Sequence, residues 1–187
     1  MMLLTGLGNP GTQYARTRHN AGFLFTERVR LAYGFPAWKS QHQGLLSKGR
    51  VGQHDVLLLQ PQTFMNLSGR SVQATAAFYK VPPPQLWVVH DELDLALGKV
   101  KYKVGGGDAG HNGLKSITAA LGGNYHRLRV GIGRPVGLQP VEDYVLQNFT
   151  AQELDVITPL LSKLIDNLPS MLENPLDTLA KLGNASV

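Results

Sequence analysis

The sequence of 187 residues contains no cysteine, and this absence excludes both disulfides and thiolate chemistry. It also contains no apolar run that approaches the length of a membrane span. The N-terminus lacks a basic segment followed by a long apolar stretch, so we expect no signal peptide and a cytoplasmic protein. With 43% hydrophobic and 17% charged residues, the composition is typical of a globular protein, and we expect residues 1–187 to form one domain.

Acidic residues are scarce in most of the chain. The net charge is +5, but residues 142–187 contain seven acidic and two basic side chains, whereas residues 1–141 contain six acidic and 16 basic ones. A basic body followed by an acidic region favours a polyanionic partner for the body. Charge alone is equally compatible with an ordinary soluble protein of alkaline pI.

A helix is missing where one glycine motif would need it. In TGLGNPG, residues 5–11, Gly6, Gly8 and Gly11 have the G-x-G-x-x-G spacing of dinucleotide-binding proteins, in which a helix begins at the third glycine and faces a pyrophosphate. The segment TQYARTRHN that follows is polar and not periodic, and Pro10 removes one N–H donor. The sequence therefore argues against a dinucleotide site.

Apolar runs and helical patterns alternate along the chain. This alternation predicts an α/β fold, with a single domain whose twisted, mixed, mostly parallel sheet is flanked by helices on both faces. The apolar residues 1–4 could form a first strand; the further strands are expected at 55–61, 86–89, 99–104 and 127–132, and helices near 21–32, 66–80 and 112–121. Thr150 and Glu153 form a capping box before a helical C-terminal region that we expect Pro159 and Pro169 to interrupt.

A histidine and a carboxylate form the first candidate pair. Asp91 follows a buried apolar strand, and ligands of open α/β sheets bind outside the carboxyl ends of strands. His19 lies just before the first predicted helix, and Asp91 could fix its tautomer and stabilise its imidazolium, as the acid of a catalytic triad does. Asp91 would raise the pKa of His19 and the helix N-terminus would lower it, and the sequence leaves this balance open.

The neighbours of Asp91 permit other interpretations. A solvated turn after the strand is one, and a metal site is another, built from His90, Asp91, Glu92 and Asp94. Adjacent residues of an extended segment point to opposite faces, however, so these side chains need not converge.

Asparagines and a glycine-rich loop provide further candidates. Asn9 occupies an Asn-Pro-Gly turn, and Asn20, Asn66 and Asn112 are each placed where they could cap a helix. The run from Gly105 to Gly110 resembles a phosphate loop, but His111 and Asn112 stand where the lysine and the hydroxyl residue should follow. The sequence therefore gives little support to a nucleoside-triphosphate site.

Basic residues alternate on two predicted strands. Lys99, Lys101 and Lys103 form one series, and Arg127 and Arg129 form the other. Period-two spacing puts each series on one face of its strand, and an apolar inner face with a basic outer face suits a phosphate backbone. A solvated strand face is the alternative.

Five segments together resemble the bacterial peptidyl-tRNA hydrolases: GLGNPG…YARTRHNAGF, PQTFMNLSG, VVHDELDL, GGGDAGHNGLKSI and HRLRVGIGRP. They follow one another in order over most of residues 5–135. The chain departs from the family's commonest pattern at Asp108-Ala109, where a glycine-rich or histidine-bearing pair is more usual, and in the short stretch before His126.

The resemblance implies hydrolysis of the ester between a peptide and the 3′-terminal ribose of tRNA, with no covalent intermediate, metal or cofactor. His19 would be the general base, and Asp91 would keep it oriented and basic. Asn9 would complete the catalytic set and recognise the acylated amino group, and the question of which asparagine faces the developing oxyanion stays open. The other substrate-binding residues would be Asn66 and Asn112 in the cleft, Tyr14 and Phe64 at the peptidyl or terminal-adenosine end, and Lys103 and Arg129 on tRNA phosphate.

The expected partner is the acceptor stem and 3′ end of peptidyl-tRNA. No membrane and no obligate protein partner is expected, and the resemblance suggests a monomer. Two alternatives stay open, an RNA-binding module without catalysis and a nucleotide-dependent oxidoreductase.

Overall fold

A seven-stranded sheet in the order β2-β3-β4-β1-β5-β7-β6 forms the centre of the computed structural model, which describes residues 1–183. The strands are β1 (Met2–Gly6), β2 (Lys39–Gln41), β3 (Gly44–Val51), β4 (His54–Pro61), β5 (Leu86–Glu92), β6 (Val100–Val104) and β7 (His126–Gly131). The central strands β4, β1, β5 and β7 are parallel, and antiparallel pairs lie at both edges. The expected α/β class with a mixed sheet is confirmed, although no strand was predicted at residues 39–51.

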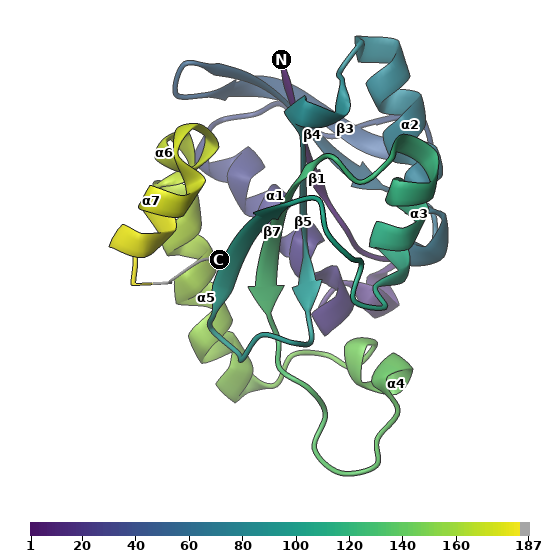
Figure 1. Cartoon of the computed structure of the whole chain (residues 1–187), viewed down its shortest axis with the longest axis vertical. Helices are drawn as coiled ribbons and strands as arrows, with labels where there is room; N and C mark the ends of the chain where they lie inside the picture. The colour runs from purple at the N-terminus through teal and green to yellow at the C-terminus, as the bar shows by residue number, and fades with distance from the viewer. Residues whose placement is uncertain (184–187) are drawn as a thin grey trace.

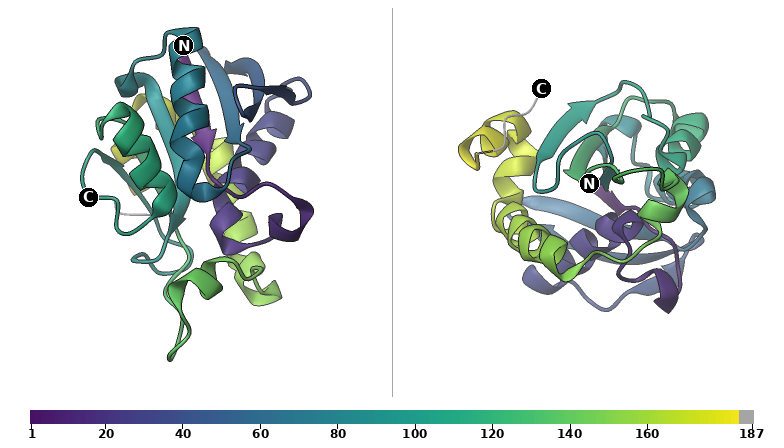
Figure 2. Two further views of the ribbon diagram at one scale, coloured as in Figure 1. Left: turned by 90° about the vertical axis from the view of Figure 1, so that its right-hand side faces the viewer. Right: turned by 90° about the horizontal axis from the view of Figure 1, so that it is seen from below.

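Helices cover both faces of this sheet, as predicted. The α-helices are α1 (Ala21–Ala32), α2 (Ser68–Tyr79), α3 (Asn112–Leu121), α4 (Val141–Val145), α5 (Ala151–Asp166), α6 (Leu168–Glu173) and α7 (Pro175–Lys181). Short 3-10 helices are η1 (Thr12–Tyr14), η2 (Arg18–Asn20), η3 (Met65–Leu67) and η4 (Pro83–Gln85). Figure 2 shows α2 and α3 side by side on one face of the sheet, and Figure 1 shows α5, α6 and α7 on the opposite side.

Alternation along the central strands builds two cores. In β4, Val56 and Leu58 join the core shared with α1 and α5, whereas Leu57 and Leu59 join the core shared with α2 and α3. Successive side chains of a strand point to opposite faces, so a continuous apolar run is what a strand covered on both sides requires. The runs that predicted β4 and β5 in the sequence have this property.

The glycines of the GLGNPG segment let α1 pack closely on the end of β1. A Cβ atom on Gly6 would lie 2.1 Å from the carbonyl oxygen of Gly22, and one on Gly22 would lie 2.3 Å from the backbone nitrogen of Leu7. Neither position has space for a side chain. The helix begins at Ala21, well past Gly11, so the helix N-terminus that a dinucleotide site needs at the third glycine is not there.

The C-terminal helices differ in one respect from the prediction. The capping box of Thr150 and Glu153 is present at the start of α5. Pro159 does not interrupt this helix, because Ile157, Leu160 and Leu161 remain packed in the core on either side of it. Pro169 instead lies in the first turn of α6, where no intrahelical bond needs its missing N–H. Within residues 1–183, none of the helices has the length and apolar character needed to cross a bilayer.

The parallel strands determine where a site can form. The carboxyl ends of β5 and β7 point toward the end of the molecule where α4 lies (Figure 1). The turn that contains η2 and the N-terminus of α3 approach the same end, since His19 of η2 and His111 before α3 both contact the last residues of β5.

Candidate active site

The buried carboxylate of Asp91 lies between two histidines. Its Oδ2 is 2.8 Å from Nδ1 of His19, and its Oδ1 is 2.9 Å from Nε2 of His111. The side chain of Asp91 is 2% exposed, and those of His19 and His111 are 12% and 9% exposed. The predicted approach of His19 to Asp91 is therefore present in the structure, and a second histidine joins it.

The hydrogen bonds of His111 determine its tautomer. Its Nδ1 accepts from the backbone N–H groups of Gly113 and Leu114, at 3.1 and 3.3 Å, and so caps α3. Nε2 must then carry the proton and donate it to Asp91. Asn112, which the sequence placed as a possible cap, is instead the first residue of the helix. In the sequence, His111 was considered only as a replacement for a phosphate-loop lysine, although a polar residue directly before a helix signals a cap.

The proton of His19 is located by the charge of Asp91. Burial alone would raise the pKa of the Asp91 carboxyl, but the charges and N–H groups of His19 and His111 hold it well below its usual value. An ionised Asp91 accepts Nδ1–H from His19, which leaves the lone pair on Nε2 of that ring. Burial lowers the pKa of His19, but the charge of Asp91 and its hydrogen bond outweigh burial, and the pKa is raised. The direction of the shift, which the sequence left open, is therefore upward, and the effect that opposes Asp91 is burial.

Asn9 is held by contacts that the sequence did not predict. Its side-chain Oδ1 accepts from the backbone N–H of Met65 at 2.7 Å, and its backbone N–H and C=O both bond to the side chain of Asn20. Asn20 was expected to cap α1, but its side chain makes no cap bond and instead fixes the turn that carries Asn9. With Oδ1 engaged, the Nδ2 amide group of Asn9 is the part that can donate to a ligand.

Two cavities meet at His19. One, of about 270 Å³, is lined by His19, Asp91, His111, Asn112 and Glu142 among others. The other, of about 250 Å³, is lined by His19, Asn9, Phe64, Asn66 and Asn112 among others. Phe64 is 59% exposed, so its ring is available to a ligand at the rim.

Six of the predicted site residues therefore surround this cleft, and Tyr14 does not line either cavity. The carbonyl of Tyr14 accepts bonds from the backbone and hydroxyl of Thr17, and a substrate contact by its side chain stays a prediction.

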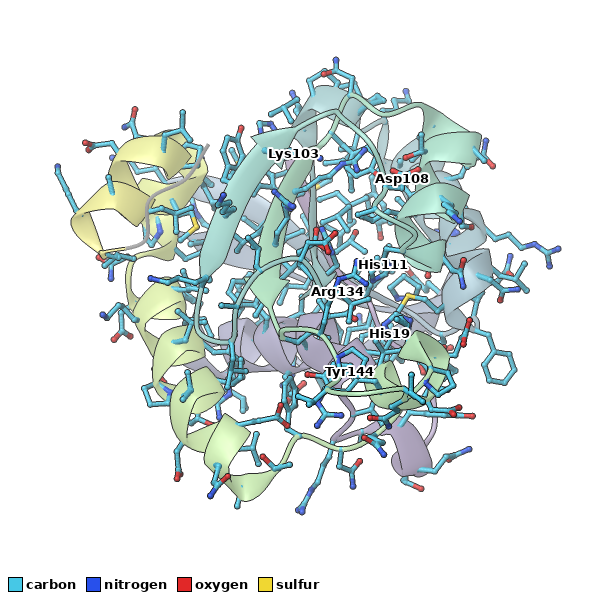
Figure 3. The ribbon with its side chains drawn as sticks, turned by 60° about the horizontal axis from the view of Figure 1, so that its bottom comes forward. His19, Lys103, Asp108, His111, Arg134 and Tyr144 are labelled. Atoms are coloured by element: carbon cyan, nitrogen blue, oxygen red, sulfur yellow. The ribbon has the colours of Figure 1, made fainter. Side chains whose placement is uncertain are left out.

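The basic side chains of β6 and β7 agree only in part with the predicted basic outer face. Lys101 and Lys103 of β6 lie opposite Arg129 and Arg127 of β7. Arg129 bonds to Glu92 at 3.0 Å and is partly exposed, and the pKa of Lys103 is lowered by burial and by the nearby arginines. Arg127 is 0% exposed, so its predicted place on an outer basic face is wrong. The glycine loop, residues 105–110, covers the Arg127 side chain, and period-two spacing along a strand does not show which side chains a loop will cover. Figure 3 shows Lys103 at a distance from His19 along the sheet.

The metal interpretation fails for the neighbours of Asp91. Glu92 bonds to Arg129 and Asp94 to Arg134, while the ring of His90 is buried and its pKa is lowered by burial to about 3. His19, Asp91 and His111 do bring three ligand atoms within 4.8 Å of one another. However, a metal on Nε2 of His111 would displace the proton that the cap of α3 requires there. The donor set fits a hydrogen-bonded carboxylate better than an ion.

A buried arginine connects this centre to the C-terminal helices. The guanidinium of Arg18, next to His19, contacts the Glu153 carboxylate through Nε and Nη2, donates to the carbonyl of Tyr144 at 2.8 Å and lies 4.0 Å from the centre of the Tyr144 ring. Figure 3 shows Tyr144 close to His19. The helix α4, which contributes Glu142 and Val145 to both cavities, is therefore anchored beside the histidine. Arg18 was not among the residues predicted from the sequence.

These features define an α/β protein with a histidine oriented by a carboxylate at the carboxyl ends of the parallel strands of a mixed sheet. The model of the peptidyl-tRNA hydrolase family matches residues 3–186. A peptidyl-tRNA hydrolase of Roseobacter denitrificans is 52% identical over 90% of this chain and 72% of its own, and one of Rickettsia bellii is 46% identical over 95% and 96%. The crystal structure of the peptidyl-tRNA hydrolase from Acinetobacter baumannii superposes with a TM-score of 0.88 at 38% identity, covering 95% of this chain and 91% of that one. The chain belongs to the peptidyl-tRNA hydrolase family.

Proposed function

We propose that this protein hydrolyses the ester between the peptide and the 3′-terminal ribose of peptidyl-tRNA, with His19 as the general base. The observation that carries the proposal is the hydrogen bond between Nδ1 of His19 and the ionised Asp91, which leaves Nε2 as the basic atom in a cleft. Family membership supports the same substrate.

The chemistry needs little beyond this pair. A water in the cleft gives its proton to Nε2 of His19 while its oxygen attacks the ester carbonyl, and Asp91 stabilises the imidazolium that forms. The tetrahedral intermediate then expels the ribose oxygen, which takes the proton back from His19. A positioned base contributes roughly 10²–10⁴-fold, and an ester already has a good leaving group, so no metal is required.

Asn9 is suited to recognise the acylated amino group. Its Oδ1 is occupied by Met65, so Nδ2 donates to a carbonyl of the peptide next to the ester. An aminoacyl-tRNA with a free α-ammonium has no such carbonyl, and it would leave this donor unpaired. Loss of such a bond to a built polar site gives strong discrimination. The exposed amides of Asn66 and Asn112 and the ring of Phe64 complete the cleft around the substrate.

Lys103 and Arg129 would hold tRNA phosphate. Their cationic groups are partly exposed on neighbouring strands. We propose that a monomer acts on the acceptor stem and 3′ end of peptidyl-tRNA, in the cytoplasm and without an obligate protein partner.

The test compares N-acetyl-aminoacyl-tRNA with the same aminoacyl-tRNA carrying a free amine, in the presence of EDTA. We expect cleavage of the acetylated substrate alone, and its loss in His19→Ala. The control His54→Ala changes another histidine paired to a carboxylate, Glu173, far from the cleft, and should stay active. Cleavage of neither substrate with tRNA still bound would favour an RNA-binding module. Undiminished cleavage by His19→Ala would refute the assigned base.

A further inference from the structure

An ion pair between the buried Arg127 and the partly exposed Asp108 has no part in the function described so far. Arg127 of β7 is fully buried, and its Nη1 donates to Oδ1 of Asp108 at 3.0 Å and to the carbonyl of Gly107 at 2.8 Å. Its Nη2 donates to the carbonyl of Gly106 at 3.3 Å, and its guanidinium lies 4.6 Å from the centre of the Tyr125 ring. Burying an arginine is costly unless it is paired, so this contact specifies one arrangement of the glycine loop.

Asp108 also ties this loop to α3. Its Oδ1 accepts from the hydroxyl of Thr118 at 3.2 Å, and its carbonyl accepts from the backbone N–H of His111 at 2.8 Å. Figure 3 shows Asp108 and His111 along the same side of α3. Asp108 thus lies three residues before the histidine that donates to Asp91.

We propose that the ion pair of Asp108 with Arg127 is a positioning clamp, which holds the glycine loop so that His111 keeps its hydrogen bond to Asp91. The loop needs such a contact because glycine has more backbone freedom than other residues, so ordering the loop costs more conformational entropy. Gly106 and Gly110 use this freedom, with φ values of +87° and +77°. The clamp acts on catalysis only through His111, and the inference therefore rests on the function proposed for His19 and Asp91.

The clamp gives different roles to two basic residues on neighbouring strands, Lys103 of β6 and Arg127 of β7. Nζ of Lys103 donates to the carbonyl of Gly107 at 3.3 Å, the same carbonyl that Arg127 holds from the buried side. A phosphate that draws Lys103 away leaves the loop fixed by Arg127. Arg127 therefore serves the reaction centre and Lys103 the phosphate, so variants of the clamp and of the phosphate site should affect different measured quantities.

The expected effect on His19 has a definite direction. When His111 withdraws, Asp91 loses one of its two N–H donors, and its charge acts more strongly on His19. The pKa of His19 then rises further, and a smaller fraction of the enzyme is in the basic form at neutral pH. The other ionisable groups around this centre are Glu92 on β5, Glu142 on α4, Lys115 on α3 and the buried His90. Arg127 and Asp108 make no hydrogen bond to these four side chains, although the charge of Arg127 contributes to the lowered pKa of His90.

The experiment compares Asp108→Ala with Asp55→Ala, in which an exposed aspartate paired to Arg50 is removed. We expect Asp108→Ala to lower kcat by roughly 10- to 100-fold, the range that small misplacements of a catalytic group produce. KM and the salt dependence of tRNA binding should change little, and the acid limb of the pH profile should move to higher pH. Asp55→Ala should match the wild type in all four measurements.

Two further variants make the test decisive. Thr118→Val removes one bond to Asp108 with little change in shape, and should give a smaller change in the same direction even where Asp108→Ala folds poorly. In the background His111→Asn, which retains a capping side chain but loses the bond to Asp91, Asp108→Ala should add almost nothing. Equal effects in both backgrounds would overturn the clamp as a device that acts through His111.

An NMR titration of the His19 ring without tRNA reads the clamp independently of the reaction. A higher pKa of His19 in folded Asp108→Ala than in wild type would support the clamp. This holds even if the wild type cleaves no peptidyl-tRNA, because the lack of cleavage would refute only the proposed function. An unchanged titration in folded Asp108→Ala, or a loss confined to KM and the salt slope, would refute the clamp.

Discussion

Replacing Glu153 with glutamine should destabilise the protein far more than a surface change. The Glu153 carboxylate accepts from Nε and Nη2 of Arg18 at 3.2 and 2.9 Å, and the two side chains are 16% and 6% exposed. Glutamine keeps the size and the capping role but removes the charge that balances Arg18. Breaking a buried ion pair by removing one partner costs about 3–5 kcal/mol, and the partial exposure of Glu153 places the expected loss near the lower value, about 3 kcal/mol.

A second substitution separates the charge from the cap. Oε1 of Glu153 also accepts from the backbone N–H of Thr150 at 2.9 Å, and alanine removes this bond as well as the charge. Removing a capping bond costs about 1 kcal/mol, so Glu153→Ala should be less stable than Glu153→Gln by about that amount. A domain of this size loses about 2–4 °C of Tm per kcal/mol, which predicts a drop of roughly 6–12 °C for Glu153→Gln.

Urea unfolding followed by circular dichroism, together with a thermal scan, measures both differences. The matched control is Glu173→Gln, because Glu173 pairs with His54 on an exposed surface, and such changes usually stay within about 0.5 kcal/mol. A loss below about 1 kcal/mol in Glu153→Gln would refute the reasoning, since Arg18 would then not depend on this carboxylate. Equal stability of the two Glu153 variants would refute only the energetic role of the cap and leave the role of the ion pair intact.

Three other predictions concern the reaction centre and the phosphate site. Hydrolysis needs neutral His19, so kcat/KM should rise with pH through a pKa above the ordinary value for histidine, and an acid limb of this profile below about pH 6 would contradict the assignment. The stability that His19 gains from Asp91 has the opposite pH dependence: it is present below the pKa of His19 in the unfolded chain and disappears as the pH rises through the pKa in the folded protein. Lys103→Ala and Arg129→Ala should each weaken tRNA binding. The slope of log affinity against log salt should become shallower by about 0.7 for each single-stranded phosphate that the variant no longer neutralises. An unchanged slope in both variants would show that Lys103 and Arg129 do not bind phosphate. Dialysis against EDTA should leave kcat unchanged, and a loss that added Zn²⁺ restores would show that a metal takes part.

Local sequence patterns predicted the frame of this site but not the contacts inside it. The apolar run before Asp91 identifies a buried strand, and the position after it follows from the rule for parallel sheets. His19 lies on a turn, and its approach to Asp91 depends on how η2 and β5 pack, so the sequence could only propose the pair. His111 had a local signal as a cap, but its bond to Asp91 joins residues 20 apart and has none.

Two of the wrong predictions, those for Arg127 and Asn20, have a common physical origin. Arg127 and Arg129 do share a strand face, as their spacing indicates, but spacing does not say which part of that face a loop will cover. Asn20 is placed where a cap belongs, yet its side chain instead makes two hydrogen bonds to the backbone of Asn9. In both cases a tertiary contact replaced the local or solvent contact that the residue type favours.

The central place of β1 in the sheet affects how the chain folds during synthesis. Its partners are β4 and β5, and β5 begins 80 residues after Gly6, the last residue of β1. At a translation rate of about 5–20 residues per second, this distance corresponds to a delay of roughly 4–16 s. During that time Leu3 and Leu4 have a strand edge with no neighbour. The first strand to be synthesised therefore gains its second neighbour only after β5 has been made, and until then its edge is open to pairing with other chains.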